Sequence, residues 1–200
     1  MPLVDIRGVL AGYRFRQLLV RLAEEYLWWI IRSWPGAEGA WFRYLFLKAT
    51  TSRLDGFCWI AQGCSIVNSH GLSIGKGFAT SRNVLIDALG GIEIGDETGI
   101  GPNTVVLSLE HRMVSRGGHF GPAARRHNPI RIGSRVWIGA NCFIKAGIVI
   151  GDDAVVGACS NVISDVPPQG RVIGSPARPY FEVVREMAQK FRRRQDDGSS

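Results

Sequence analysis

The chain has 200 residues and a mass of 22.0 kDa, which fits one domain or one domain with an appendage. Apolar residues make up 46% and charged residues 20%, so the composition excludes an intrinsically disordered protein and allows a sizeable core. The 25 glycines against 9 prolines exclude collagen and a Pro/Gly linker, and the net charge of +7 favours an anionic partner such as a phosphate-bearing cofactor, a lipid surface or nucleic acid.

The first predicted element is an amphipathic helix within residues 9–34. Its apolar side chains recur at the spacing of one helix face: Phe15, Leu19, Leu22, Tyr26, Trp29 and Ile30. The opposite side is expected to be polar, with Arg14, Gln17, Arg21, Glu24 and Glu25. The longest unbroken apolar run, at 26–31, is far shorter than the roughly 18 residues of a membrane span. Residues 1–53 therefore form a helical segment whose apolar face fits its own domain, a sister subunit or a membrane surface, and the density of tryptophan slightly favours the membrane.

A six-residue period follows this segment. From residue 132 an aliphatic residue opens each hexapeptide: Ile132, Ile138, Ile144, Ile150, Val156 and Val162. Strands alternate every two residues and helices repeat every 3.6, so neither explains this period. Three short strands joined by tight corners do explain it, because each coil then places one aliphatic residue per face inward, about 4.8 Å above its counterpart. The period therefore predicts a parallel β-helix, with glycine at its corners.

The repeat divides into five coils: 54–71, 74–91, 94–111, 132–149 and 150–167. Cys58, Cys64 and Cys142 take positions where a compact side chain fits inside a corner. Because C-x-x-C spacing and a secretory signal are absent, we expect reduced, space-filling cysteines in the cytosol. The N-terminal helix and the tail 178–194 are expected to cover the open ends of the coils.

The third coil is followed by an excursion at 112–129, which we expect to be a functional loop because the frame around it is so regular. Segment 112–135 holds six arginines and no acid, which favours an anionic acceptor, although a solvated loop explains these arginines equally well. His111 ends the third coil, where a solvent-facing histidine is poised to act as a general base; the simpler interpretation is a surface histidine without a role. The roles of His119 and His127, inside the loop, stay open.

The run from Pro129 resembles the C-terminal half of the hexapeptide-repeat O-acetyltransferases. It contains in order P-I-x-I-G, V-W-I-G, I-G-D-x-A-V-V-G-A, D-V-P-P and G-x-P-A-R. The likeness is strongest to the maltose, galactoside and polysaccharide-modifying sugar acetyltransferases, and it covers residues 54–180. WPGAEGAWFRYLF, at 34–46, resembles the Pro-Gly-x-x-Gly segment of polysaccharide-biosynthesis acyltransferases. The resemblance implies an all-β, left-handed parallel β-helix of about five coils, and we expect a short basic helix and a disordered tail at 181–200.

The resemblance also assigns roles residue by residue. His111 matches the family's catalytic base, and Asn83 matches an asparagine that contacts the acceptor sugar. Positions along the coenzyme A groove are matched by Ala140, Ala158, Ile163, Ser164 and Arg178. Ile163 and Ser164 stand where the family usually has Thr-Lys, so a lysine near the phosphates is missing. The interval from His111 to the Trp-Ile-Gly motif is also about two residues longer than in the sugar acetyltransferases, which predicts an acceptor pocket of different shape.

The resemblance implies transfer of an acetyl group from acetyl-CoA to a sugar hydroxyl, in surface-polysaccharide or lipid-linked glycan biosynthesis. His111 would remove the hydroxyl proton, backbone N–H groups would stabilise the oxyanion, and neither a covalent intermediate nor a metal is expected. The family implies a homotrimer, in the cytoplasm or on the inner face of the cytoplasmic membrane. N-acetylation of an amino sugar, serine O-acetylation and an inactive membrane-bound scaffold are the alternatives. Nucleic-acid binding is not expected, and the spacing of the four histidines does not match the metal site of gamma-class carbonic anhydrases.

Overall fold

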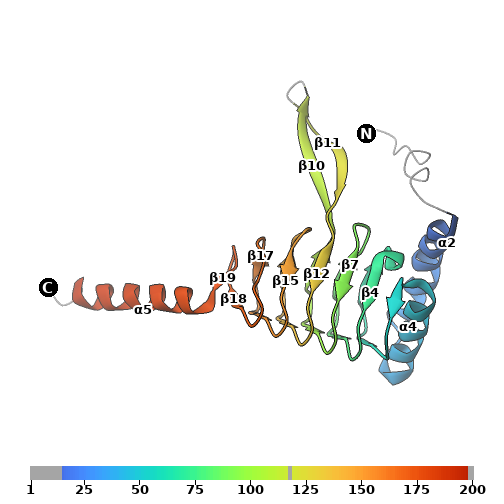
Figure 1. Ribbon diagram of the computed structural model, residues 1–200, viewed down its shortest axis with the longest axis horizontal. Coiled ribbons are helices and arrows are strands. Elements are labelled where there is room, and N and C mark those ends of the chain that lie inside the picture. Colours follow the sequence, from blue (N-terminus) through green and yellow to red (C-terminus); the bar gives the residue numbers. More distant parts are fainter. Residues whose placement is uncertain (1–14, 117–118, 198–200) are drawn as a thin grey trace.

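The computed structural model describes residues 15–116 and 119–197. Its centre is a mainly parallel β-solenoid, with helices on its first coil, a hairpin projecting from its middle and one helix leaving its last coil (Figure 1). The predicted all-β, left-handed parallel β-helix of about five coils, with an N-terminal helical extension and a C-terminal helix, is confirmed. Arg14 and the end of the predicted tail, at 198–200, lie outside the described residues.

Three sheets form the faces of the solenoid. The first sheet contains β1 (Arg53–Leu54), β4 (Leu72–Ile74), β7 (Ile92–Ile94), β12 (Ile130–Ile132) and β15 (Val149–Ile150). The second sheet contains β2 (Trp59–Ile60), β5 (Ala79–Thr80), β8 (Gly99–Ile100), β13 (Trp137–Ile138), β16 (Val155–Val156), β18 (Arg171–Ile173) and, antiparallel to it, β19 (Arg178–Pro179). The third sheet contains β3 (Ser65–Val67), β6 (Leu85–Asp87), β9 (Val105–Leu107), β14 (Phe143–Ile144) and β17 (Asn161–Val162). A 3-10 turn, η2 (Ser69–Gly71), precedes β4.

The residue that opens each hexapeptide points inward. In the second sheet these positions stack in one buried column: Ile60, Thr80, Ile100, Ile138, Val156 and Val172. Full burial of an aliphatic side chain is worth about 1.5–3 kcal/mol, so such columns supply much of the stability. The corner residues Cys58, Cys64 and Cys142 are buried free thiols, as predicted. Burial raises the pKa of Cys58 to about 12, which keeps its thiol protonated and unreactive.

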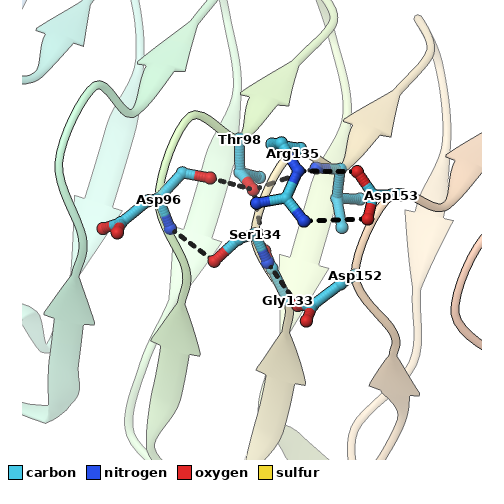
Figure 2. Close-up of polar contacts among 8 residues, drawn as sticks. Asp96, Thr98, Gly133, Ser134, Arg135, Asp152 and Asp153 are labelled. Atoms are coloured by element: carbon cyan, nitrogen blue, oxygen red, sulfur yellow. Dashed lines mark hydrogen bonds and ion pairs between the residues drawn. The ribbon is translucent and has the colours of Figure 1, made fainter.

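Polar ladders join neighbouring coils at the corner between the first and second sheets (Figure 2). Ser134 bridges two coils, because its hydroxyl accepts the N–H of Asp96 (3.1 Å) and its own N–H donates to Asp152 Oδ1 (2.8 Å). Arg135 donates two hydrogen bonds, of 2.7 and 2.8 Å, to the carboxylate of Asp153, and this lowers the pKa of Asp153. At least one arginine of segment 112–135 therefore has a structural role, because Asp153 balances the charge of Arg135 without a ligand.

The N-terminal segment forms α2 (Phe15–Ala23), the π-helix η1 (Glu24–Trp28), α3 (Trp29–Ile31) and α4 (Gly36–Thr50). The predicted apolar face does not pack on the solenoid, because its six residues are 49–77% exposed. A neighbouring stripe makes the contact instead, through Val20, Glu24 and Trp28. The Trp28 ring packs on Phe46 and its Nε1 donates to the Cys64 carbonyl (3.1 Å). Within the described residues, the helices are too short or too polar to cross a membrane.

Glu24, expected on the polar outward side, is buried at 5% exposure. Its carboxylate accepts the backbone N–H groups of Asn68 (2.9 Å) and Ser69, and it pairs with Arg21 at 3.3 Å. The expectation failed because helical periodicity treats every charged side chain as solvated. A carboxylate can be buried when backbone donors of a distant segment meet it.

A buried arginine fastens α4 to the first coil. Arg43 is 1% exposed, and its guanidinium donates to the carbonyls of Ile60 (2.8 Å) and Trp34 (2.8 Å) and to the last turn of α3. Gly39 allows this approach, because a Cβ there would lie 2.1 Å from the Trp34 carbonyl oxygen, and Gly36 begins α4 with a φ of +74°. The Pro-Gly-x-x-Gly segment thus shapes the turn between the helices, and the N-terminal helices cover the first coil, as expected.

At the C-terminal end of the solenoid, the structure differs from the expectation that the tail covers the last coil. Helix α5 (Tyr180–Asp197) points away from the last coil instead of covering it (Figure 1). Most of its described side chains are exposed, including the apolar Phe181 and Met187. Arg178 pairs with Glu186 (3.1 Å) and Glu182 (3.7 Å) of this helix. The last coil is closed by β19, which turns back along β18.

The excursion at 112–129 is a hairpin. β10 (Leu109–Arg116) pairs antiparallel with β11 (His119–His127), so its backbone groups are satisfied without the solenoid. The third coil therefore ends with β9, and His111 lies in β10 opposite Arg125, not at a coil corner as predicted. The side chains of residues 111–126, which include His111 and His119, lie outside the described side chains.

Candidate functional site

A groove of about 580 Å³ lies on the outer face of the third sheet, beside the base of the hairpin. This volume is within the roughly 300–1,000 Å³ of small-molecule sites. Six of its lining residues carry the argument below: Glu110, Asn141, Phe143, Lys145, Cys159 and Ile163. The groove combines apolar side chains on its floor with amide, ammonium and carboxylate groups at its sides, which is the composition of a site for a long, partly polar ligand.

One edge of the solenoid, between the second and third sheets, borders this groove. Successive coils place Asn83, Asn103, Asn141 and Cys159 at this edge, all with a left-handed φ between 54° and 60°. Each of the four is joined to the coil before it by a backbone hydrogen bond, and Asn83 Nδ2 donates to Asn103 Oδ1 (3.3 Å). Asparagine is among the residues that tolerate this conformation best, so Asn83 has a structural reason for its place. We call these four residues the asparagine edge.

Four of the five predicted coenzyme A positions lie at or beside this edge and groove. Ala140 and Ala158 occupy the same corner on adjacent coils, since the Cys159 N–H donates to the Ala140 carbonyl (2.8 Å). Ile163 is 47% exposed and lines the groove, and Ser164 follows it on the surface. Asn83 lies on the same edge two coils before Asn141, a distance of about 10 Å at the usual spacing of strands. The structure thus brings together residues that are far apart in the chain.

Arg178 lies apart from the lining of the groove. It pairs with Ile173 across β18 and β19, and its guanidinium binds the carboxylates of Glu186 and Glu182. The hydrogen bonds that Arg178 donates to the Glu186 carboxylate raise the pKa of Arg178 and lower that of Glu186. A phosphate at Arg178 would therefore compete with two acids of α5.

Lys145 was missed by the sequence analysis. It lies one coil from Ile163, because β14 and β17 pair Ile144 with Val162. Its Nζ is 3.3 Å from Glu110 Oε1, and both side chains are about 40% exposed, so the pair is weak and its ammonium is accessible. The signal was present in the sequence, since Lys145 precedes Ile163 by one 18-residue coil. Lys145 thus supplies a cation in the groove, although the lysine that the family usually has at the position of Ser164 is missing.

The histidines are spread over several elements. His111 follows Leu109 and Glu110, which line the groove, so its backbone lies at the base of the hairpin. His127 is exposed, with Nδ1 3.3 Å from the Leu89 carbonyl. Among the described side chains, three or more His, Cys, Asp or Glu residues do not gather closely enough to hold a metal ion.

The chain is similar in sequence and in structure to known proteins. A family model described as the hexapeptide repeat of succinyl-transferase matches residues 129–160. The galactoside O-acetyltransferase of Escherichia coli (strain K12) is 33% identical over 145 residues, which cover 70% of this chain and 68% of that protein. Nodulation protein L of Rhizobium meliloti (strain 1021) is 42% identical over 155 residues, which cover 71% of this chain and 84% of that protein. A hexapeptide-repeat acetyltransferase from Vibrio cholerae, solved with acetyl coenzyme A, aligns with a TM-score of 0.73 and 28% identity over 84% of this chain and 90% of that one.

Proposed function

The chain belongs to the hexapeptide-repeat acetyltransferases, and we propose that it moves an acetyl group from acetyl-CoA to a sugar hydroxyl in the synthesis of a surface polysaccharide or lipid-linked glycan. One observation carries the proposal. The groove, the asparagine edge and the base of the hairpin that holds His111 are contiguous. A thioester in the groove would therefore lie between the asparagine edge, which includes Asn83, and the base of the hairpin, which holds His111.

The groove is suited to coenzyme A by size and by chemistry. Acetyl-CoA would supply an acetyl group already activated as a thioester. The backbone at Ala140 and Ala158 is accessible at the corner, and Phe143 and Ile163 offer apolar surface. Lys145 would provide a cation for a phosphate, because its weak pair with Glu110 can be exchanged at little cost.

His111 would act as the general base. A neutral imidazole, with a pKa near 6.5 when unperturbed, can accept the proton of a sugar hydroxyl at neutral pH. It would then return this proton to the departing sulfur, while the sugar oxygen bonds to the acetyl carbon and the C–S bond breaks. Backbone N–H groups at the corners would stabilise the developing negative charge. No covalent enzyme intermediate is needed, because the sugar oxygen attacks the acetyl carbon directly. Cys58 and Cys142 are buried thiols with raised pKa values.

The test measures release of the coenzyme A thiol with a panel of sugars, amino sugars and serine. His111→Ala is expected to lower kcat by at least about 100-fold while leaving the fold intact. The matched control is His127→Ala, which lies in β11 at the base of the same hairpin, opposite Leu109, and should keep the activity. An undiminished rate in His111→Ala would remove this histidine from the mechanism. Release with serine or an amino sugar alone would change the acceptor class, and no release with any acceptor would favour an inactive scaffold.

We further propose a homotrimer, because the groove is carried on one outer face and the hairpin extends away from its own solenoid (Figure 1). A hairpin in this orientation can reach a second solenoid, so that two chains would enclose one site. Light scattering after gel filtration should give about three times 22.0 kDa. A monomer that is fully active would contradict the proposal.

We also propose that the exposed apolar face of α2, η1 and α3 lies against a membrane surface. Tyr26 and Trp29 are 69% and 66% exposed, and amphipathic aromatic side chains favour the headgroup region. Deletion of residues 1–48 should abolish pelleting with phospholipid vesicles, and Trp29→Ser should weaken it. Unchanged pelleting would contradict the proposal, and loss of the trimer instead would assign this face to a sister subunit.

A further inference from the structure

Two tryptophans on the outer face of the second sheet have no role in the function proposed above. The strand register places Trp59, Ala79, Gly99 and Trp137 in one outward column, with one residue per coil. Trp59 is 45% exposed and Trp137 is 53% exposed. An indole exposed to water on a sheet does not gain the free energy of apolar burial. Two such indoles in one column therefore indicate a surface that binds another molecule.

The two indoles border an open slot of about 380 Å³. Gly99 shapes it, because a Cβ there would lie 2.8 Å from the Cε3 and Cζ3 atoms of Trp137. The Trp137 indole therefore lies over the coil of Gly99, while the coil of Ala79 stays uncovered. At about 4.8 Å per coil, the backbones of Trp59 and Trp137 are about 14 Å apart, which leaves room for one ring over Ala79.

The rim of this slot is polar and basic. Ser81 and Arg82 line it where the chain turns toward the asparagine edge. Among the described side chains, the exposed Arg82 forms no ion pair with a carboxylate, whereas Arg131 and Arg135 pair with acids on neighbouring coils. An unpaired guanidinium beside an aromatic slot is a site for a planar anion such as a carboxylate, or for a phosphate.

We propose that the slot formed by Trp59, Ala79, Arg82 and Trp137 binds a pyranose ring that carries an anionic substituent. The C–H groups on the faces of a pyranose carry partial positive charge, and they stack on the negative face of an indole. Ser81 would hydrogen-bond a ring hydroxyl, and Arg82 would bind the anion in two-point fashion. The anion is the carboxylate of a uronic acid residue or the phosphate of a sugar phosphate, which the test separates.

The position of the slot gives it a place in the reaction. Arg82 directly precedes Asn83, so the slot and the groove lie on the two sides of the asparagine edge. The slot would hold a sugar unit next to the one that is acetylated. This inference rests on the proposed function in its choice of a sugar acceptor, but binding to the slot requires no acetyl transfer.

The experiment measures binding to the full chain by calorimetry with methyl β-glucuronide, glucose 1-phosphate and the neutral methyl β-glucoside. At least one anionic probe should bind about tenfold more tightly than the neutral one, and the stronger of the two identifies the anion. Trp59→Ala should weaken its binding by about tenfold or more. Ala79→Leu should also weaken binding by about tenfold or more, because the larger side chain fills the slot while both tryptophans stay in place. Arg82→Gln should remove the preference for the anion and retain binding of the neutral probe.

Trp41→Ala is the matched control, because Trp41 is 51% exposed and stacks on Phe57 outside the slot. Its affinity should equal that of the unsubstituted chain, and the melting temperature of each variant verifies folding. Equal affinity in Ala79→Leu and the unsubstituted chain would overturn the slot, as would the absence of any preference for an anion. Acetyl transfer with a KM that no slot variant changes would overturn the slot alone. Slot-dependent binding without release of coenzyme A would overturn the proposed acetyl transfer alone.

Discussion

The two ends of the solenoid are closed in opposite ways. At the first coil, α2, η1, α3 and α4 are fastened by Glu24 and Arg43, which are 5% and 1% exposed and bind backbone groups of other segments. At the last coil, α5 is held by a solvent-exposed pair between Arg178 and Glu186 and points outward (Figure 1). From this difference we expect a charged side chain to stabilise a tertiary contact strongly where water is excluded and weakly where water competes.

The largest effect is expected at Arg43, at the buried end. Arg43→Met keeps an apolar stem but leaves the carbonyls of Ile60 and Trp34 without their donor. A buried polar group without a partner costs about 1–3 kcal/mol, so the free energy of unfolding should fall by about 3 kcal/mol. Urea denaturation measures this change.

Lys48→Met is the control for Arg43, since Lys48 is exposed on the same helix and loses only a weak contact with the Tyr44 ring. It should change the free energy of unfolding by less than about 0.5 kcal/mol. Equal effects of the two substitutions would mean that burial does not distinguish these cations, and the comparison of the two ends would fail.

A smaller effect is expected at Glu24. Glu24→Gln keeps the shape of the side chain but replaces charge-assisted acceptance from the N–H groups of Asn68 and Ser69 by weaker neutral bonds. The free energy of unfolding should fall by about 1.5 kcal/mol, and protease cleavage within α2 should become faster. Glu25→Gln, at the exposed neighbouring position, should leave both measurements unchanged.

The smallest effect is expected at the exposed end. Glu186→Gln removes the main partner of Arg178, yet the melting temperature at pH 7 should stay within a degree or so, because both groups are solvated. Arg178 lowers the pKa of Glu186 in the folded chain, so any stabilisation is present above the unfolded pKa and is lost as the pH falls through the folded one. A melting-temperature series from pH 7 to pH 3 should therefore converge for the two proteins at low pH. A large difference at pH 7 would show that α5 is held as firmly as α4.

The coils were predictable because the six-residue period expresses a geometry that each coil repeats. Ile138 and Val156 point inward for the same local reason, and each coil confirms the others. For the candidate site, the motifs placed Ala140 and Ile163 within their coils, and the role of both residues in binding coenzyme A stays a prediction. Lys145 was not predicted as a site residue, because its proximity to Ile163 follows from the stacking of coils and not from any motif.

The N-terminal helix shows where prediction from periodicity ends. Its apolar spacing is real, but the residues that pack on the solenoid are Val20, Glu24 and Trp28. The partners of Glu24 are backbone N–H groups more than forty residues away, and a backbone donor leaves no signature in the sequence. The hairpin had no signature in the six-residue period either, because its strands pair with each other.

The sequence by itself determined the solenoid, the number of its coils and the inward position of their aliphatic residues, because these depend on contacts between neighbours one repeat apart. Only the tertiary structure decided which face of the first helix is buried, that His111 lies in a projecting hairpin, and that Lys145 and the Trp59–Trp137 slot flank one edge. These features depend on contacts between segments that the six-residue repeat does not relate. A buried polar contact, for example, needs two specific groups at one point in space.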